Sequence, residues 1–385
     1  MDLSYIINLL GEEIEGDVSA VSPPLNMTSN YRYASVDSFR KAIADERESL
    51  IYSRGNNQTI NLLCRKLAAL EGAEDCLVFG SGMAAISAAI LSRVSSGDHI
   101  ICQQHPYSWT NTMLNSNILP RFGVSVSMVD CAELENILNA IKPETRVIYL
   151  ESPNSWTFEL QDIEAIAMIA KEKGIITILD NSFSSPLFQQ PVKMGIDLVV
   201  HSASKYLGGH SDLVGGVCCG SKQMIDKIFR NEFMTFGGIM SPFSAWLFLR
   251  SLRTLHIRMN HISSSTLSIV NFLEKHPKIS KVYYPFAVGN PQRVLAEKQM
   301  LKGSGLFSVE TVSKDTTAIE AFCNKLKYFS LAVSWGGHES LVIPALIFSD
   351  VRQPGFLPDN MIRFSIGLEE TEVLLADIEN ALKEL

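Results

Sequence analysis

Short apolar runs alternate with helical patterns through the first two thirds of this 385-residue chain. The apolar runs occupy residues 76–79, 99–102, 124–129, 147–150, 175–179 and 198–200, and helical periodicity covers 59–71, 83–94, 133–141 and 163–173. Strands that alternate with helices at this spacing form a mostly parallel sheet wrapped by helices. We therefore predict an α/β domain in this part of the chain.

The pattern changes beyond Gly238. A long helical stretch covers 243–275, short strand-like segments lie near 282, 306–309 and 330–333, and an amphipathic helix is expected over 370–385. The first 50 residues are mixed and are broken by Pro23-Pro24. A chain of this length exceeds what one hydrophobic core serves. We predict an N-terminal arm over 1–50, the α/β domain over 51–245, and a smaller α+β domain over 246–385.

Composition excludes several classes of protein. Hydrophobic residues make up 46% and charged residues 19% of the chain, which is typical of an ordinary folded protein. A net charge of -8 argues against nucleic acid as a partner. No apolar run reaches the length of a membrane span, and the first residues do not resemble a signal peptide. We expect a cytoplasmic protein that binds neither membranes nor nucleic acid.

The cysteines and histidines point away from disulfides and metals. The seven cysteines are odd in number and scattered, as is usual for reduced thiols in the cytoplasm. They never occur at CxxC spacing, and the eight histidines never occur at HxxxH spacing. We therefore predict no metal site.

Asp180 and Lys205 each lie just past an apolar, strand-like run. Ligands bind at the carboxyl ends of parallel strands. A carboxylate there can pair with a protonated pyridine nitrogen, and a lysine there can react with an aldehyde, so the pair suggests pyridoxal phosphate. Ser202 and Ser204 would then offer hydroxyls to the phosphate. The alternative for Lys205 alone is a solvated surface residue.

A glycine-rich turn gives a second chemical signal. Gly80-Ser81-Gly82-Met83 lies between a predicted strand and a predicted helix. Glycines let the backbone approach an anion, and the N–H groups at a helix start carry the positive end of its dipole. A phosphate group fits such a turn, although a plain strand-to-helix turn would have the same sequence.

Four further side chains have suitable chemistry. Arg54 can bind a phosphate with two hydrogen bonds, and Tyr52, two residues earlier, can donate a hydrogen bond or act as an acid. Tyr107 can stack on a flat ring or fill the core. Arg363 lies in an apolar, strand-like run, where its charge requires an anion, either a structural carboxylate or that of a substrate.

The order of several short motifs carries a family resemblance. They are Tyr52-Ser53-Arg54, Phe79-Gly80-Ser81-Gly82-Met83, Gly97-Asp98-His99, Asp180-Asn181-Ser182, Ser202-Ala203-Ser204-Lys205-Tyr206, Gly209-His210-Ser211-Asp212, and Ser334-Trp335-Gly336-Gly337-His338-Glu339-Ser340. From about Pro23 to the C-terminus, the chain resembles the Cys/Met-metabolism family of pyridoxal phosphate enzymes. That family includes cystathionine β-lyase, cystathionine γ-lyase, cystathionine γ-synthase and methionine γ-lyase.

The resemblance implies a fold and a cofactor site. The fold is the aminotransferase-like fold type I, and the implied catalytic residues are Lys205, Tyr107 and Tyr52. Lys205 would carry pyridoxal phosphate, Asp180 would hold its pyridine nitrogen, and Tyr107 would stack on its ring. The phosphate would be held by Gly82, Met83, Ser202 and Ser204, together with Tyr52 and Arg54 from a neighbouring subunit. This sharing implies a homodimer or homotetramer.

The substrate side of the site is also implied by the resemblance. Arg363 would bind the substrate α-carboxylate, with Ser334 and Ser155 as further substrate-binding residues. Ser155 lies in Glu151-Ser152-Pro153-Asn154-Ser155-Trp156, which departs from the usual ESPxNP of the family. Trp109, where methionine γ-lyases usually have cysteine, would narrow the pocket beside Tyr107.

The implied activity is cleavage of a carbon–sulfur bond in a sulfur amino acid. The leading reading is a lyase of EC class 4.4.1 that acts by β- or γ-elimination on cystathionine, cysteine, homocysteine or methionine. A γ-replacement synthase, which joins an activated homoserine to a thiol, uses the same cofactor residues. A non-catalytic protein that binds pyridoxal phosphate is the third alternative.

Overall fold

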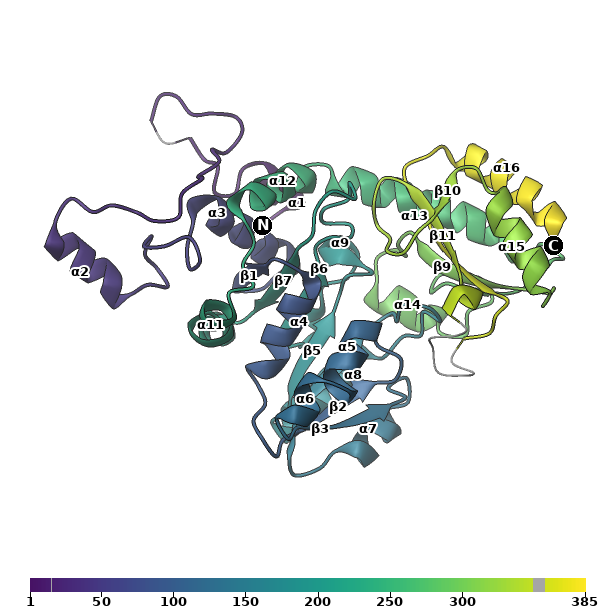
Figure 1. Ribbon diagram of the computed structural model, residues 1–385, viewed down its shortest axis with the longest axis horizontal. Coiled ribbons are helices and arrows are strands. Elements are labelled where there is room, and N and C mark those ends of the chain that lie inside the picture. Colours follow the sequence, from purple (N-terminus) through teal and green to yellow (C-terminus); the bar gives the residue numbers. More distant parts are fainter. Residues whose placement is uncertain (15, 349–356) are drawn as a thin grey trace. The chain divides into compact units, whose positions relative to one another are not determined.

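The computed structural model describes residues 1–14, 16–348 and 357–385, which divide into two compact units (Figure 1). The large unit comprises Met1–Glu151, Gln161–Gly208 and Asp212–Thr254. The small unit comprises Ser152–Leu160, Gly209–Ser211 and Leu255–Leu385. Two short segments from the middle of the sequence thus belong to the C-terminal unit. No helix among the described residues is both long and apolar enough to cross a membrane.

A seven-stranded sheet forms the centre of the large unit. Its strands are β1 (Asp75–Phe79), β2 (His99–Gln103), β3 (Ser125–Val129), β4 (Thr145–Glu151), β5 (Ile176–Asp180), β6 (Leu198–Ser202) and β7 (Gly216–Gly220). They lie in the order β1-β7-β6-β5-β4-β2-β3. Every pair is parallel except the two that involve β7. The predicted α/β fold with a mostly parallel sheet is confirmed.

Alternating side chains along the strands build a core on each face of this sheet. Ile100, Cys102 and Tyr149 belong to one cluster, and the intervening Ile101 and Ile148 belong to another. This period of two is what a strand buried on both faces requires. The first cluster includes apolar residues of α4 (Gly82–Leu91) and the second includes those of α8 (Ile163–Lys173), so helices cover both faces.

Further helices surround the sheet of the large unit. They are α3 (Gln58–Glu71), α5 (Ser108–Asn115), α6 (Ile118–Arg121), α7 (Leu134–Ala140), α9 (Ser185–Phe188), α10 (Lys222–Ile228), α11 (Met234–Phe236) and α12 (Pro242–Leu252). The 243–275 stretch, expected as one helix, is interrupted after α12. Its second part, α13 (Leu255–Leu273), belongs to the small unit.

The first helix anchors the N-terminal residues to the large unit. In α1 (Leu3–Asn8), the carbonyls of Ile6 and Ile7 accept hydrogen bonds from the buried ammonium of Lys66, which also pairs with Glu12 at 2.9 Å. Further along, the chain runs as an arm that carries α2 (Val36–Ala44) away from the sheet (Figure 1). Large apolar side chains are exposed on this arm, among them Val18, Val21, Met27, Val36 and Ile43.

A five-stranded sheet forms the small unit. Its strands are β8 (Ile279–Tyr283), β9 (Leu306–Thr311), β10 (Phe329–Leu331), β11 (Ser340–Pro344) and β12 (Met361–Ser365), in the order β10-β11-β12-β9-β8. Only β10 and β11 pair in parallel. With α13, α14 (Arg293–Gln299), α15 (Thr316–Lys325) and α16 (Thr371–Ala381), this sheet confirms the predicted smaller α+β architecture.

All seven cysteines are free thiols. Cys76 of β1 lies directly opposite Cys219 of β7 in the antiparallel register. Burial raises the pKa of Cys76 and Cys218, and it raises that of Cys323, in the small unit, to about 12. These side chains are therefore uncharged members of the core at neutral pH.

Candidate active site

Asp180 ends β5 at the carboxyl edge of the large sheet, where it is buried. One of its oxygens, Oδ1, accepts hydrogen bonds from the backbone N–H of Ser182 at 2.9 Å and from the Ser182 hydroxyl at 2.5 Å. Burial raises the pKa of Asp180, while these hydrogen bonds and the charges of His201 and Lys205 oppose the rise. The neighbours thus favour the ionised form that a pyridinium nitrogen would need.

Lys205 follows the adjacent strand, β6. Its backbone N–H donates to the carbonyl of Ser202, the last residue of that strand, at 3.1 Å. Because β5 and β6 are neighbouring parallel strands, Asp180 and Lys205 emerge at the same edge of the sheet. The structure thus brings together the two side chains that the sequence paired, and Lys205 is close enough to lower the pKa of Asp180.

The start of α4 lies against the end of β6. A Cβ atom added at Gly82 would lie 3.0 Å from the Cβ of Ser202 and 3.1 Å from its hydroxyl oxygen, so this close approach favours glycine. Ser81 caps the helix by accepting a hydrogen bond from Ala84 N–H at 3.1 Å. The first N–H groups of the helix, at Gly82 and Met83, have no partner within it.

Ser204 lies on the turn after β6 and helps to shape it. Its hydroxyl accepts a hydrogen bond from Gly215 N–H at 3.0 Å. Gly82, Met83, Ser202 and Ser204 therefore come from α4 and from the end of β6, which meet at Gly82 and Ser202. Helix N–H groups beside serine hydroxyls are suited to a phosphate group.

Tyr107 lies at the start of α5, with 43% of its surface exposed. Its backbone N–H donates to Glu151 Oε2 at 2.8 Å. Burial raises the pKa of the Tyr107 phenol, and the negative charges of Glu151 and Asp180 raise it further. Tyr107 therefore keeps its proton at neutral pH and is near both carboxylates.

Glu151 is a site residue that the sequence reasoning did not single out. It ends β4 and lies opposite Asp180 in the parallel register of β4 and β5. The side chain is 7% exposed and holds the backbone of Tyr107. Its position directly after the apolar run 147–150 repeats the signal that pointed to Asp180.

A second group that the sequence did not reveal lies beside the site. His201 Nε2 is 2.9 Å from Glu71 Oε2, and Asn181 donates to Glu71 Oε1 at 3.4 Å. All three side chains are buried. This network ties α3 to the ends of β5 and β6, and His201 helps to lower the pKa of Asp180.

Tyr52 and Arg54 lie together just after the arm. Tyr52 forms an isolated bridge with Asn30, and the Arg54 guanidinium lies 5.6 Å from the centre of the Tyr52 ring. Both side chains are exposed. The contacts found among the described residues do not join either of them to Asp180 or Lys205.

Arg363, Ser155 and Ser334 belong to the small unit. Arg363 is buried on β12, and its Nη1 donates to the carbonyl of Ser155 at 3.3 Å. Ser334 lies between β10 and β11 with a φ of 81°, an unusual backbone conformation for a residue other than glycine. Nearby, Gly336 N–H donates to Ser365 at the end of β12. The structure therefore joins Ser155 directly to Arg363, and it places the segment of Ser334 beside the same strand.

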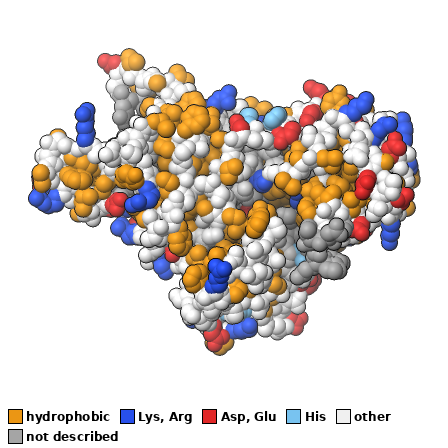
Figure 2. All heavy atoms as spheres, viewed as in Figure 1, with side chains coloured by type: hydrophobic (Ala, Val, Ile, Leu, Met, Phe, Trp, Pro, Cys, Tyr) orange, Lys and Arg blue, Asp and Glu red, His pale blue; other side chains and the backbone are white. Residues whose placement is uncertain are grey.

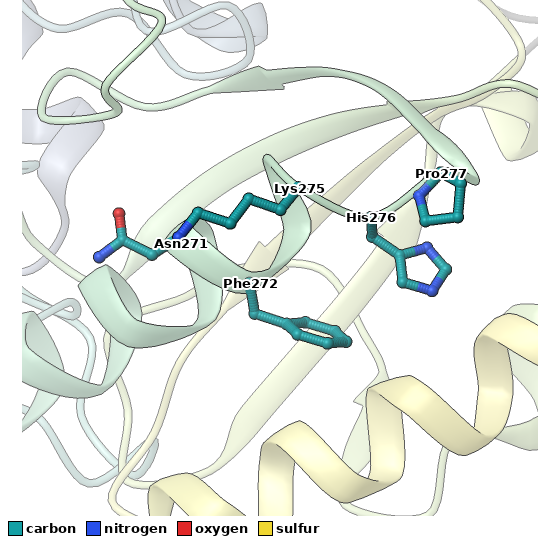
Figure 3. Close-up of a pocket in the computed structure, with 5 residues that line it drawn as sticks. All are labelled: Asn271, Phe272, Lys275, His276 and Pro277. Carbon is teal, nitrogen blue, oxygen red and sulfur yellow. The ribbon is translucent and has the colours of Figure 1, made fainter.

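Two cavities lie apart from these residues. One, of about 400 Å³, is a surface pocket at the end of α13 in the small unit, lined by Asn271, Phe272, Lys275, His276 and Pro277 (Figure 3). The other, of about 450 Å³, lies in the large unit, and its lining includes Cys64, Arg65 and Asp75. No predicted site residue lines either cavity.

Comparison with known proteins identifies the family. The family model described as "Cys/Met metabolism PLP-dependent enzyme" matches residues 6–383. The chain belongs to this family. The Cys/Met metabolism family is dependent on pyridoxal phosphate (PLP), so the resemblance, the cofactor and the metabolic class expected from the sequence are confirmed.

Several relatives within the family match along nearly their whole length. L-Methionine gamma-lyase of Fusobacterium nucleatum is 36% identical over 370 residues, which cover 94% of this chain and 93% of the relative. Cystathionine beta-lyase of Lactococcus lactis is 37% identical over 383 residues, 97% of each chain. Cystathionine gamma-lyase of Bacillus subtilis is 36% identical over 384 residues, 98% of this chain and 97% of the relative.

A solved structure supports the family fold. The crystal structure of metB from Corynebacterium glutamicum matches with a TM-score of 0.91 and 32% sequence identity. The match covers 100% of this chain and 98% of that one.

The geometry of the large unit fits the cofactor of the Cys/Met metabolism family. A buried carboxylate ends β5, an amine follows β6, and an aromatic ring lies near the carboxylate. At Gly82, a Cβ atom would fill the space where α4 meets β6. These groups match the pyridine nitrogen, the aldehyde, the ring and the phosphate of PLP respectively.

Proposed function

We propose that this enzyme is a carbon–sulfur lyase that cleaves cystathionine or a related sulfur amino acid by β- or γ-elimination, releasing a keto acid, ammonia and a thiol. The observation that carries the proposal is the placement of Tyr107, a protonated phenol, near the carboxylate of Asp180, which in turn lies close to Lys205. Elimination of a thiol needs an acid for the departing sulfur as well as a base for the substrate. The names of the three relatives compared above, all lyases, support the same reading.

We assign the cofactor to the groups described in the large unit. Lys205 would hold its aldehyde carbon, Asp180 its pyridine nitrogen and Tyr107 its ring. Gly82, Met83, Ser202 and Ser204 would hold its phosphate. When bound, PLP supplies an electron sink that stabilises negative charge on the substrate Cα.

The acid–base work falls to two side chains. The Lys205 amine removes the proton from the substrate Cα, and a further transfer by the same amine makes γ-elimination accessible. The Tyr107 hydroxyl protonates the leaving sulfur. The raised pKa of Tyr107 keeps this proton in place at neutral pH.

Arg363 is our candidate ligand for the substrate α-carboxylate. A guanidinium group binds a carboxylate through parallel N–H donors, and burial strengthens that interaction. Arg363 is 8% exposed, and the carbonyl of Ser155 accepts from one of its nitrogens. We propose Ser155 and Ser334 as further residues on the substrate side.

The arm supports a homo-oligomer. Val18 is 87% exposed and Val21 is 91% exposed, although apolar side chains of this size are usually buried. The apolar side chains of the arm form part of the surface seen in Figure 2. We propose that a second copy covers them, and that Tyr52 and Arg54 bind the cofactor phosphate of that copy. A homodimer is the minimum assembly, and a homotetramer satisfies the same contacts.

Products distinguish the proposed lyase from a γ-replacement synthase. We expect purified enzyme with cystathionine alone to release a keto acid and ammonia, where pyruvate indicates β-cleavage and 2-oxobutanoate indicates γ-cleavage. A synthase would instead form product only when both an O-acylhomoserine and a thiol are supplied. If neither assay gives product from fully loaded protein, the non-catalytic reading replaces both.

The lysine assignment has its own test. Lys205→Ala should keep the circular dichroism spectrum of the parent but lose turnover in every assay. Borohydride reduction followed by peptide mapping should label Lys205 in the parent enzyme. A label on another residue would overturn the assignment of Lys205.

A further inference from the structure

The segment Ser152–Leu160 is held in shape by one buried side chain. Asn154, which is 2% exposed, accepts hydrogen bonds through Oδ1 from the backbone N–H groups of Thr157 at 3.1 Å and Phe158 at 2.8 Å. Its Nδ2 donates to the Thr157 hydroxyl and to Glu159. Side-chain turns of this kind fix the backbone of a loop. The two residues after Asn154, Ser155 and Trp156, are therefore presented in a defined orientation.

Both residues contact Arg363. The Ser155 carbonyl accepts from Nη1 at 3.3 Å, and the Trp156 ring centre lies 4.6 Å from the guanidinium carbon. This distance is within the range of a cation–π interaction, for which tryptophan is the best aromatic partner. Since Arg363 is buried, the attraction is screened less than it would be in water.

Trp156 is itself fixed by packing. Its ring lies edge-on to that of Phe348, with ring centres 6.1 Å apart, and it packs against the buried side chains of Ala345, Leu357 and Met361. Met361 is on the same strand as Arg363. The indole is thus held from one side while it contacts the guanidinium.

An aromatic partner has a chemical advantage for an arginine that must bind substrate. A guanidinium carries its five N–H donors in its plane. A carboxylate that partners a guanidinium binds these in-plane donors, whereas an aromatic ring interacts with the face of the guanidinium and does not use them. Proline, the usual residue of the family at the position of Trp156, has no π face.

We propose that Trp156 is a positioning residue that holds Arg363 for the substrate α-carboxylate, which makes it a determinant of affinity for amino acids over their neutral analogues. This inference rests on the proposed role of Arg363. It gives a structural reason for the departure from ESPxNP at this point of the chain.

Equilibrium binding to the PLP-loaded enzyme tests the proposal. L-Alanine has no leaving group for elimination, and L-alaninamide differs from it in lacking the carboxylate. Both can be titrated by the change in cofactor absorbance. For Trp156→Leu we expect the Kd of L-alanine to rise about ten-fold and that of L-alaninamide to stay within two-fold of the parent, since only the carboxylate depends on Arg363. For Trp156→Phe, which keeps a weaker π face, the Kd of L-alanine should lie between those of the parent and of Trp156→Leu.

A matched control comes from the same cluster. Tyr283 also packs against it and carries its own cation, with Lys281 Nζ 4.2 Å from its ring centre. Tyr283→Leu therefore removes an aromatic ring and a cation–π pair without touching Arg363, and both dissociation constants should match those of the parent.

Other outcomes distinguish an error in the proposed role of Arg363 from an error in that of Trp156. If Arg363→Leu weakens L-alanine and L-alaninamide equally, the proposed role of Arg363 is wrong. If Arg363→Leu weakens only L-alanine while Trp156→Leu weakens neither ligand, or weakens both equally, the role of Arg363 stands and the inference about Trp156 is wrong. Should Trp156→Leu fail to fold, ring-fluorinated tryptophan can replace the four tryptophans instead. It should weaken L-alanine in the parent but not in Trp156→Phe.

Discussion

At the scale of single residues, Ser182 decides which way Asp180 faces. Its oxygen accepts from Ser202 N–H at 2.6 Å and lies 2.5 Å from Asp180 Oδ1. A backbone N–H can only donate, so the single hydroxyl proton of Ser182 must go to Asp180. With Oδ1 bound twice by Ser182, the other carboxylate oxygen is the one that we propose for the pyridine nitrogen of the cofactor.

Removing that hydroxyl should weaken cofactor binding. In Ser182→Ala, Asp180 loses a charge-assisted hydrogen bond that lowers its pKa, so the pKa rises further. We expect about ten-fold weaker binding of PLP at neutral pH, measured by equilibrium dialysis. As the pH is lowered, the loss of affinity should begin at a higher pH than in the parent.

Two variants check the cause of this effect. Ser182→Thr keeps the hydroxyl and should bind PLP like the parent. Ser92→Ala removes another buried hydroxyl, which donates to Ala89 at the end of α4, and should leave affinity for PLP unchanged. Equal loss in Ser92→Ala and Ser182→Ala would contradict a specific role for Ser182.

The buried carboxylate of Asp180 is expected to destabilise the cofactor-free protein. Its folded pKa is raised above the unfolded value, so its contribution to stability is present below the unfolded pKa and is lost as the pH rises through the folded pKa. Asp180→Asn is therefore expected to raise the melting temperature of the apoprotein at neutral pH while abolishing turnover. Thermal melts should converge with those of the parent as the pH falls towards about 4, the ordinary pKa of an aspartate. A lower melting temperature at neutral pH would disprove this.

At the scale of elements, the strands with β-branched runs were predicted well and β7 was missed. Runs 76–79 and 198–200 lie within β1 and β6, because apolar side chains buried on both faces have a clear sequence signal. β7 has the sequence Gly-Val-Cys-Cys-Gly, and the glycine at each end weakens the sequence signal of a strand. At Gly216, a Cβ atom would lie 2.1 Å from the Ser81 carbonyl oxygen. That contact between distant parts of the chain has no local signal.

The same kind of long-range contact limited the prediction of the site. Asp180, Lys205 and the turn at Gly82 were predicted from strand ends and glycines, which are local features. The Glu71–His201 pair joins residues 130 positions apart, and Trp156 meets Arg363 across a still longer separation in sequence. Periodicity reveals which face of an element is buried, but not which polar side chains meet there.

Gly216 offers a test at this scale. Gly216→Ala should push the start of α4 away from β7, lowering stability by about 1–3 kcal/mol and weakening PLP binding together. Urea unfolding and dialysis measure the two effects. Gly289→Ala, whose Cβ atom would lie 3.4 Å from the Glu274 carboxylate, is the control and should change neither. Unchanged binding in Gly216→Ala would argue against the start of α4 as part of the phosphate site.

At the scale of the whole molecule, the exposed arm predicts shared active sites. If Tyr52 and Arg54 bind the cofactor of a partner subunit, each active site takes Lys205 from one chain and Arg54 from the other. Arg54→Ala and Lys205→Ala then inactivate a site through different chains. Mixed after mild unfolding and refolding, the two inactive variants should recover about a quarter of parental activity, since half the dimers are hybrids with one intact site. Activity after mixing and mass by analytical ultracentrifugation provide the readout.

Two results would reject this arrangement. A monomer in solution excludes it directly. No recovery in mixtures whose hybrids are verified by mass spectrometry would mean that Arg54 and Lys205 act from one chain. As a control, mixing Lys205→Ala with Asp180→Asn should restore nothing, because Asp180 ends β5 and Lys205 follows β6, which are neighbouring strands of one chain's sheet.

The buried thiols allow the transient opening of each unit to be measured separately. Cys76, Cys218 and Cys219 are sealed within the large sheet, whereas Cys323 is the cysteine of the small unit. A protonated, inaccessible sulfur reacts with an alkylating reagent only during an excursion that exposes it. Timed alkylation followed by peptide mass spectrometry would therefore report, in one sample, whether the large and small units open independently of each other or unfold together.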